Sequence, residues 1–223
     1  YVIEDNAQAI GANCKFSDGT KKKAGTIGHV GATSFFPSKN LGAYGDGGAI
    51  FTNDDALAHK IRGIVNHGMY ERYHHDVVGV DSRLDSIQAA VLNAKLPLLD
   101  QYNKARQNAA RKYSLAFEGH KNIIAPSICE ICDCHVFHQY TLRIIDADRN
   151  GLMQHLLDKG IPCAIYYPIP LHSQKAYVDS RYKEEDFPVT NQLVKEVISL
   201  PMHTELDDDQ IQFITNSILE YLN

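Results

Sequence analysis

The feature that most constrains this chain is a short apolar strand that runs into a lysine and is followed by closely spaced glycines. The segment reads Ser-Phe-Phe-Pro-Ser-Lys-Asn-Leu-Gly over 34–42 and leads to Gly-Asp-Gly-Gly at 45–48. Aromatic and β-branched residues before a proline predict a strand over 33–36, which Pro37 ends because it lacks a backbone N–H. Lys39 therefore lies just beyond a strand end, where ligands bind in open α/β sheets.

This segment alone leaves two interpretations of Lys39 open. Most lysines in loops are simply solvated. The alternative is an amine that bonds covalently to a carbonyl cofactor. The neighbouring glycines permit positive φ angles and close backbone approach, which suits a large flat ligand.

Composition excludes several classes of function. The 223 residues suit one large or two small domains, and 44% of them are apolar, which is enough for a core. The net charge is −5 with acids and bases intermixed, so the sequence shows no basic segment that would bind nucleic acid or an anionic membrane. No apolar run is long enough to span a bilayer, and no secretory signal opens the chain. The five cysteines, an odd number, indicate a reduced cytoplasmic protein.

The first residues indicate a second functional group near the lysine. An apolar run over 1–4 is typical of a buried parallel strand, and Asp5 follows it. Asp5 either caps the next turn or holds the ring nitrogen of a cofactor protonated, which makes the ring a better electron sink. Because the chain opens inside a strand pattern without an initiator methionine, we expect it to be a piece of a longer protein whose N-terminal part is absent.

The remaining patterns predict an α/β part followed by a smaller α+β part. Helices are expected from a cap at Asn53 to Gly68, from a cap at Ser82 to Pro97, from about 98 to Gly119, and over 148–159, 190–198 and 207–222. Strands are expected over 49–52, 136–145 and 161–167. Residues 14–28 read as a surface excursion, with the lysines at 21–23 in a solvated turn. We therefore assign 1–119 to a large domain with a linking helix, and 120–223 to a small α+β domain.

A cysteine cluster raises the question of a metal site. Cys129, Cys132, Cys134, His135 and His138 have spacings that a zinc knot could use. No second, distant ligand pair accompanies them, and the last histidine falls inside a predicted strand. We expect a reduced surface loop without metal.

Three motifs together resemble the DegT/StrS sugar aminotransferases over essentially the whole chain. They are Val-Ile-Glu-Asp-Asn-Ala-Gln-Ala-Ile-Gly at 2–11, the segment 34–48, and Arg-Leu-Asp-Ser-Ile-Gln-Ala-Ala at 83–90. These enzymes use pyridoxal phosphate (PLP) and have the aspartate aminotransferase fold, fold type I. The resemblance thus implies an α/β fold: part of that PLP-binding large domain plus a small α+β C-terminal domain. The segments 72–75, 79–85, 167–171 and 199–203 resemble most closely the enzymes that aminate a 3-keto UDP-N-acetylglucosaminuronic acid.

The resemblance implies a role for each matching residue. Lys39 would carry the cofactor covalently on its amine and later move a proton. Asp5 would pair with the pyridinium nitrogen, and Gln8 would lie against the ring and its phenolic oxygen. Ser34 would hydrogen-bond the phosphate.

In this family a segment of the neighbouring subunit completes the site, so the resemblance implies a homodimer. The matching positions are Asp81 and Arg83. Arg83, Tyr166 and Tyr167 would face the sugar, and the guanidinium fork of Arg83 suits a uronate carboxylate. Asp81 departs from the family, which usually has an asparagine that helps to bind the phosphate, and the added negative charge should weaken cofactor binding. Tyr166 replaces a histidine common in the most similar enzymes.

The implied activity is transfer of an amino group from an amino acid, expected to be L-glutamate, to a nucleotide-linked keto sugar for cell-surface polysaccharide synthesis. Sugar dehydratases of the same scaffold replace the lysine with histidine, so Lys39 argues against that class. A third hypothesis is an inactive or cofactor-free relative that serves as a binding protein. Asp81 and the absent N-terminal part favour that hypothesis modestly.

Overall fold

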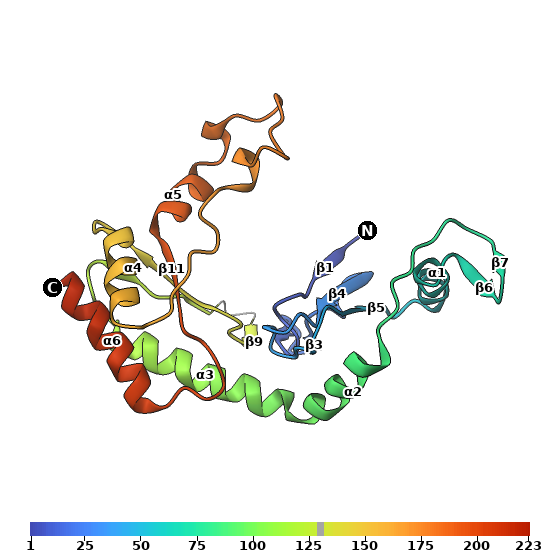
Figure 1. Cartoon of the computed structure of the whole chain (residues 1–223), viewed down its shortest axis with the longest axis horizontal. Coiled ribbons are helices and arrows are strands. Elements are labelled where there is room, and N and C mark those ends of the chain that lie inside the picture. Colours follow the sequence, from blue (N-terminus) through green and yellow to red (C-terminus); the bar gives the residue numbers. More distant parts are fainter. Residues whose placement is uncertain (129–131) are drawn as a thin grey trace. The chain divides into compact units, whose positions relative to one another are not determined.

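The computed structural model describes residues 1–128 and 132–223, which form two compact units (Figure 1). The first unit comprises Tyr1–Lys104 and Ile128–His138, and the second comprises Ala105–Ser127 and Gln139–Asn223. The division falls inside the long helix α3 (Leu99–Ala116) and differs from the boundary expected at 119/120. A continuous helix carries no sequence signal for such a crossing, which explains the difference.

A small sheet in the first unit positions the segment around Lys39. Its strands, in the order β1-β4-β5, are β1 (Ile3–Asp5), β4 (Val30–Ser34) and β5 (Gly48–Phe51). Strands β1 and β4 are parallel, with Asp5 opposite Ala32, whereas β4 and β5 are antiparallel, with Ser34 opposite Gly48. The carboxyl ends of β1 and β4 and the start of β5 therefore share one edge of the sheet.

The loop before β4 is held against β1 by a carboxylate. Glu4 accepts hydrogen bonds from the backbone N–H groups of Gly25, Ile27 and Gly28 at 2.7, 2.6 and 2.5 Å. Partial burial opposes the charged form of Glu4, but the three donors outweigh it and lower the pKa of this carboxyl below its ordinary value. The contact lets the backbone of Gly25 lie directly against Gly31 of β4, where no side chain would fit.

A second sheet of the first unit corrects the expectation for residues 14–28. It has the order β3-β2-β9 and consists of β2 (Asn13–Lys15), β3 (Lys21–Lys23) and β9 (Cys132–Cys134). The three lysines expected in a turn form an exposed edge strand, a position where charged side chains discourage pairing with other chains.

The cysteine cluster lies partly outside the described residues, since Cys129 belongs to 129–131. Cys132 lies opposite Cys14 in the pairing of β2 with β9. Among the residues that the structure describes, no three histidine, cysteine or acidic side chains are grouped so that they could hold a metal ion. His138 precedes strand β10 (Tyr140–Ile144), so the expected strand over 136–145 is too long at its start.

Strand β5 is followed by helix α1 (Asp55–Val65) and then by a hairpin of strands β6 (Met69–Glu71) and β7 (His74–His75). Asp54, and not Asn53, caps α1, and its carboxylate accepts the N–H of Leu57.

The cap expected at Ser82 is also wrong, because residues 81–85 are not helical and α2 (Ser86–Lys95) begins after Asp85. On α2, Leu92 is the buried residue and Ile87 is exposed. A 3-10 turn at Leu96–Leu98 joins α2 to α3.

The second unit contains an antiparallel sheet of order β11-β10-β8. The outer strands of this sheet are β8 (Ile123–Ile124) and β11 (Val197–Leu200). The remaining elements are the helices α4 (Arg149–Asp158), α5 (Pro188–Glu196) and α6 (Asp208–Leu222), and two 3-10 turns at Leu171–Ser173 and Glu184–Asp186. Its core includes Tyr113, Tyr140, Leu152, Ile198 and Ile218.

Two expectations for the second unit are wrong. No strand forms over 161–167, where Ala164 makes only an isolated bridge to Ser199. The helix expected to run to Ile198 ends at Glu196, because the β-branched residues that follow belong to β11. None of the helices formed by the described residues has the length and apolar character needed to cross a membrane.

Candidate active site

The carboxyl edge of the first sheet brings two of the predicted site residues onto adjacent strand ends. Asp5 ends β1 and Ser34 ends β4, the parallel neighbour of β1. The Oδ1 atom of Asp5 accepts the N–H of Ala7 at 3.0 Å, so this carboxylate also closes the following turn. The Oγ atom of Ser34 accepts the N–H of Phe36 at 3.2 Å, which leaves its hydroxyl proton available for a ligand.

Lys39 lies in a closed turn after β4. Its backbone N–H donates to the carbonyl of Phe36 at 2.9 Å. The N–H of Ala43 returns to the carbonyl of Phe35 at 2.8 Å, so the turn folds back on the end of the strand. Lys39 is half-buried, and its Nζ has no hydrogen-bond or ion-pair partner within the part of the chain that the structure describes. The amine is therefore positioned by the turn and remains available for chemistry.

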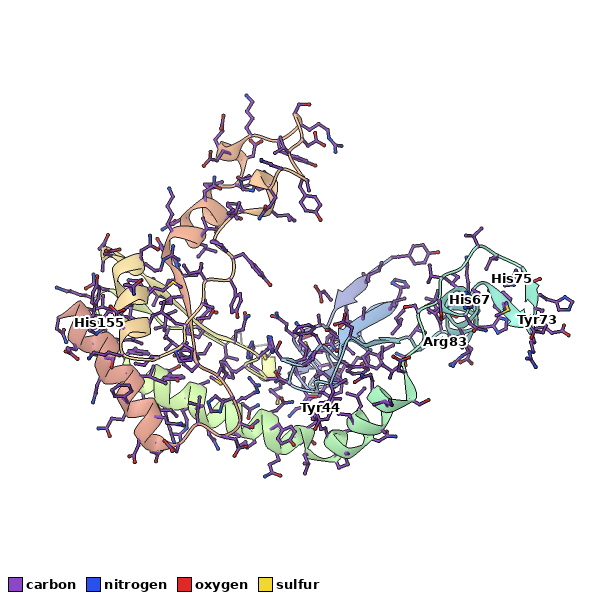
Figure 2. All side chains as sticks on the ribbon, viewed as in Figure 1. Tyr44, His67, Tyr73, His75, Arg83 and His155 are labelled. Atoms are coloured by element: carbon purple, nitrogen blue, oxygen red, sulfur yellow. The ribbon has the colours of Figure 1, made fainter. Side chains whose placement is uncertain are left out.

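The glycines that follow Lys39 in the sequence are required because their backbone lies very close to the backbone of other residues. A Cβ on Gly42 would lie 2.3 Å from the carbonyl oxygen of Pro37, and a Cβ on Gly48 would lie 2.7 Å from that of Thr33. Lys95 of α2 donates to the carbonyl of Gly42 at 2.7 Å and lies 5.0 Å from the ring centroid of Tyr44 (Figure 2). The loop is thus held in place by α2.

The donor set at this edge fits pyridoxal phosphate. An amine matches its aldehyde, a carboxylate matches its pyridine nitrogen, and a hydroxyl matches its phosphate. Gln8 is exposed three residues beyond Asp5, and its side chain has no partner among the described residues.

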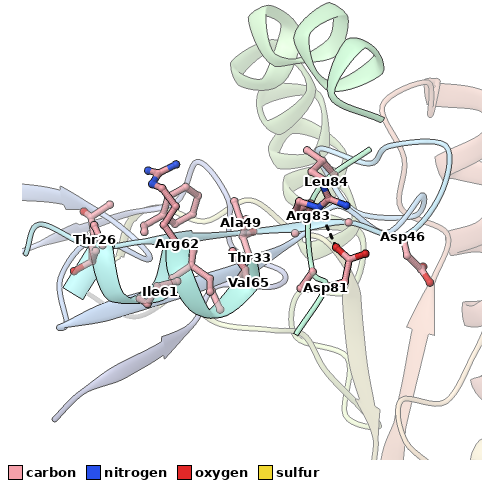
Figure 3. A pocket seen from close by; sticks show the side chains of 18 of the residues that line it. Thr26, Thr33, Asp46, Ala49, Ile61, Arg62, Val65, Asp81, Arg83 and Leu84 are labelled. Atoms are coloured by element: carbon pink, nitrogen blue, oxygen red, sulfur yellow. Dashed lines mark hydrogen bonds and ion pairs between the residues drawn. The ribbon is translucent and has the colours of Figure 1, made fainter. Parts of the chain in front are cut away.

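A cavity of about 980 Å³ opens beside the glycine run (Figure 3). The start of β5, helix α1 and the extended segment 81–84 line it, with Asp46, Arg62, Asp81 and Arg83 among the charged residues. The predicted residues Asp81 and Arg83 thus line a cavity of the same chain, together with Thr33 and Gly48 from the sheet.

Asp81 is not an isolated negative charge. Nε of Arg83 donates to its Oδ1 at 3.0 Å (Figure 3), and Nε2 of His67 lies 3.7 Å from the same atom. The hydrogen bond and charge of Arg83 lower the pKa of the Asp81 carboxyl below its ordinary value. The two Nη groups of Arg83 make no hydrogen bond to any described residue, so they can receive a second carboxylate. The departure from asparagine is therefore compensated in part by a neighbouring cation.

We predict that the pKa of Asp81 lies below the ordinary 3.8 and returns towards it in the variant Arg83→Gln. The stabilisation from the pair is present above the ordinary aspartate pKa and is lost as the pH falls through the lowered pKa. Carboxyl 13C NMR titration of Asp81 measures the change. An unchanged pKa in Arg83→Gln would contradict the pairing, and Arg181→Gln, which alters an arginine of the second unit that pairs with Asp179, serves as the control.

Tyr166 and Tyr167 lie in the second unit, where both are exposed and their ring centroids are 5.6 Å apart. Their role at the site remains a prediction. Sequence reasoning missed Glu4, Asn40 and His67 as supporting residues. Asn40 directly follows the lysine, but the partners of these side chains lie too far along the chain to be recognised from spacing.

A lysine beyond a parallel strand, with an acid at the end of the neighbouring strand, is the arrangement expected of the PLP-dependent transferases of fold type I. The chain belongs to the DegT/DnrJ/EryC1/StrS aminotransferase family, whose sequence pattern matches residues 1–219. Members of this family depend on PLP. The predicted family and fold class are confirmed.

Two curated relatives and one solved structure illustrate the similarity. The chain is 44% identical over 99% of its length to the pleiotropic regulatory protein of Geobacillus stearothermophilus. It is 45% identical over 96% of its length to the UDP-2-acetamido-2-deoxy-3-oxo-D-glucuronate aminotransferase of Pseudomonas aeruginosa. It covers 58% and 56% of these two relatives, a little over half of each. The chain also resembles the crystal structure of an aminotransferase of this family from Brucella abortus, with a TM-score of 0.90 and 38% identity. The match covers 100% of this chain and 57% of the Brucella abortus chain.

Proposed function

We propose that the protein is a PLP-dependent aminotransferase that moves an amino group from an amino acid to a nucleotide-linked keto sugar. The observation that carries this proposal is Lys39 in its closed turn at the sheet edge that also bears Asp5 and Ser34. Nucleotide-sugar aminotransferases recur among the relatives of the chain, which supports the same conclusion.

Each residue has a defined task in this proposal. When bound, pyridoxal phosphate supplies the aldehyde carbon that takes up the amino group and the ring that accepts electrons from the reacting carbon. Lys39 moves a proton at the amino-bearing carbon, as a general base and then as a general acid. Asp5 keeps the ring nitrogen protonated, Ser34 donates to the phosphate, and Gln8 lies against the ring. Asp81 orients Arg83 through the Nε hydrogen bond.

The substrate we infer is a UDP-linked 3-keto N-acetylglucosaminuronate, with L-glutamate as the amino donor. The free Nη groups of Arg83 support a carboxylate-bearing sugar, since a guanidinium fork binds two carboxylate oxygens. The P. aeruginosa relative is named for an acid sugar of this kind. Tyr166 and Tyr167 complete the sugar site in this proposal. We further propose a cytoplasmic homodimer that serves polysaccharide synthesis.

Loss of the Arg83 guanidinium should discriminate between acidic and neutral sugars. We expect Arg83→Gln to raise KM for the keto uronate by about 10- to 100-fold, which corresponds to one charged hydrogen-bonded contact, and to leave KM for the matching neutral keto sugar nearly unchanged. Steady-state kinetics with both sugars measures this. Arg181→Gln, which alters an exposed arginine that pairs with Asp179, is the control. An equal change for both sugars would contradict the assignment of the uronate.

The activity itself is tested by mixing the PLP-loaded protein with L-glutamate and then with the keto sugar. The proposal requires conversion of glutamate to 2-oxoglutarate and one amino sugar per 2-oxoglutarate formed. A protein that binds the sugar but never consumes glutamate or another amino acid would support the binding-protein hypothesis instead.

A further inference from the structure

We propose that Asn40 is a positioning residue for Lys39, and that it acts through a buried amide network that joins four distant segments of the first unit. This inference rests on the proposed function of Lys39. The network comprises the side chains of Asn40, Asn103 and His138 and the backbone carbonyls of Ile10 and Val136.

The contacts of Asn40 are made in the interior of the first unit. Its side chain is only 8% exposed. Its Nδ2 donates to Oδ1 of Asn103 at 2.8 Å and to the carbonyl of Val136 at 2.9 Å. Its Oδ1 lies 3.3 Å from Nδ1 of His138. Asn103, at 3% exposure, donates from Nδ2 to the carbonyl of Ile10 at 3.2 Å.

The two backbone carbonyls fix the direction of the hydrogen bonds around Asn40. A carbonyl can only accept, so the carbonyl of Ile10 requires the amide nitrogen of Asn103, and the carbonyl of Val136 requires that of Asn40. The Oδ1 of Asn103 then faces a donor, and the Oδ1 of Asn40 is left to accept from Nδ1–H of His138. Flipping either amide would place acceptor against acceptor.

This arrangement fixes the backbone on both sides of the Lys39 side chain. The backbone N–H of Lys39 donates to the carbonyl of Phe36, and the side chain of Asn40, the next residue, is bound within the network. The Nζ of Lys39 has no partner among the described residues that could orient it before a ligand arrives. The position of the amine therefore depends on the placement of the turn, and the turn depends on Asn40.

The network also assigns a task to residues 132–138. This segment is flanked in sequence by residues of the second unit but belongs to the first. It supplies two of the groups that contact Asn40, the carbonyl of Val136 and the ring of His138. His138, which the sequence placed among possible metal ligands, thus supports the lysine turn.

A purely structural role would give a different experimental result from a positioning role. A buried amide that merely stabilises the fold would lower the unfolding midpoint when it is removed. A positioning residue would also change the ionisation and rate of the lysine-bound cofactor, because a displacement of about 1 Å at a reacting group costs about 100-fold in rate. Both properties can be measured on the PLP-loaded protein.

The experiment compares Asn40→Ala and Asn103→Ala with the control Asn122→Ala. Asn122 is buried in the second unit, where its Nδ2 donates to the carbonyl of Ile145 at 2.9 Å. The readouts are the pH midpoint of the absorbance band of the lysine-bound cofactor, and the maximal rate and apparent Kd for its reaction with L-glutamate. We expect both network variants to shift the midpoint in the same direction and to lower the maximal rate by about tenfold or more, with a smaller change in Kd. We expect Asn122→Ala to change neither.

Asn103→Ala leaves Asn40 and Lys39 intact, so it carries the test if Asn40→Ala does not fold. Wild-type midpoint and rate in a folded network variant would overturn the inference. If the wild-type protein itself forms no lysine-bound cofactor, the proposed function fails and the inference fails with it. If the wild-type protein shows the band of the lysine-bound cofactor and the folded variants behave like it, the positioning role alone is refuted.

Discussion

Replacing Lys39 with alanine is expected to reduce amino transfer by about 1,000-fold or more, because the variant loses both the covalent attachment of the cofactor and the group that moves the proton. The cofactor would still find the carboxylate of Asp5 and the hydroxyl of Ser34, so binding should weaken less than the rate falls. The measurement is kcat and KM for glutamate and for the keto sugar, together with the equilibrium Kd for PLP.

The matched control for Lys39 is Lys60→Ala, which removes an exposed amine from α1 and should leave the rate unchanged. Added methylamine should restore part of the Lys39→Ala activity, since a soluble amine can replace the missing base. If Lys39→Ala transaminated at a rate near that of the wild type, the assignment of the catalytic base would be wrong.

Gly31→Ala is expected to destabilise the first unit by about 3 kcal/mol or more, the upper range for overpacking. A Cβ at this position would lie 2.0 Å from the carbonyl oxygen of Gly25 and 2.6 Å from its carbonyl carbon. The obstacle is backbone, which cannot rotate away as a side chain could. Glu4 holds the same loop through three hydrogen bonds, so β4 must move instead, and Ser34 would move with it.

Gly19→Ala provides the control for Gly31→Ala. Gly19 lies in the turn between β2 and β3 at φ +85°, and a Cβ there would meet nothing within 4 Å. Its cost should be about 1 to 2 kcal/mol, from the left-handed conformation alone. Urea unfolding followed by circular dichroism compares the two variants. Equal midpoints for Gly31→Ala and Gly19→Ala would show that the close approach of the two backbone segments is not present in solution.

The sheet edge could be predicted from the sequence because its signals are local. The place of Lys39 beyond a strand was predicted, but the bounds expected for that strand are wrong, because β4 ends at Ser34 and not at Phe36. The apolar run before Asp5 predicted the parallel neighbour, but β1 is exposed at Ile3 and not buried as expected. The bounds of α4 and α6 were also predictable within a residue or two, since each follows a capping aspartate, Asp148 or Asp207.

The parts that sequence reasoning missed depend on pairings between distant residues. Ser82 is a residue type that often caps helices, but the neighbouring Asp81 pairs with Asn66 in an isolated β-bridge and the helix begins only at Ser86. Residues 132–134 give no strand pattern of their own and become a strand by pairing with β2. The hydrogen bonds around Asn40 join residues up to 98 positions apart, so no spacing rule could reveal them.

The electrostatics of the candidate site show the same limit. The sequence identified the extra negative charge of Asp81 but gave no distance between it and a cation. The structure pairs it with Arg83, two residues away on an extended segment, while the Nη groups of that arginine remain unpaired among the described residues. The spacing of two residues was visible in the sequence, but the conformation that makes the contact was not.

The central claim is that the amine of Lys39 carries the cofactor. The most direct measurement is mass spectrometry of the PLP-loaded protein after borohydride reduction and digestion. We predict a pyridoxyl-phosphate adduct on the peptide that contains Lys39 and on no other lysine peptide. A wild-type protein that binds PLP but yields no adduct, or an adduct on a different lysine, would contradict this account of the site.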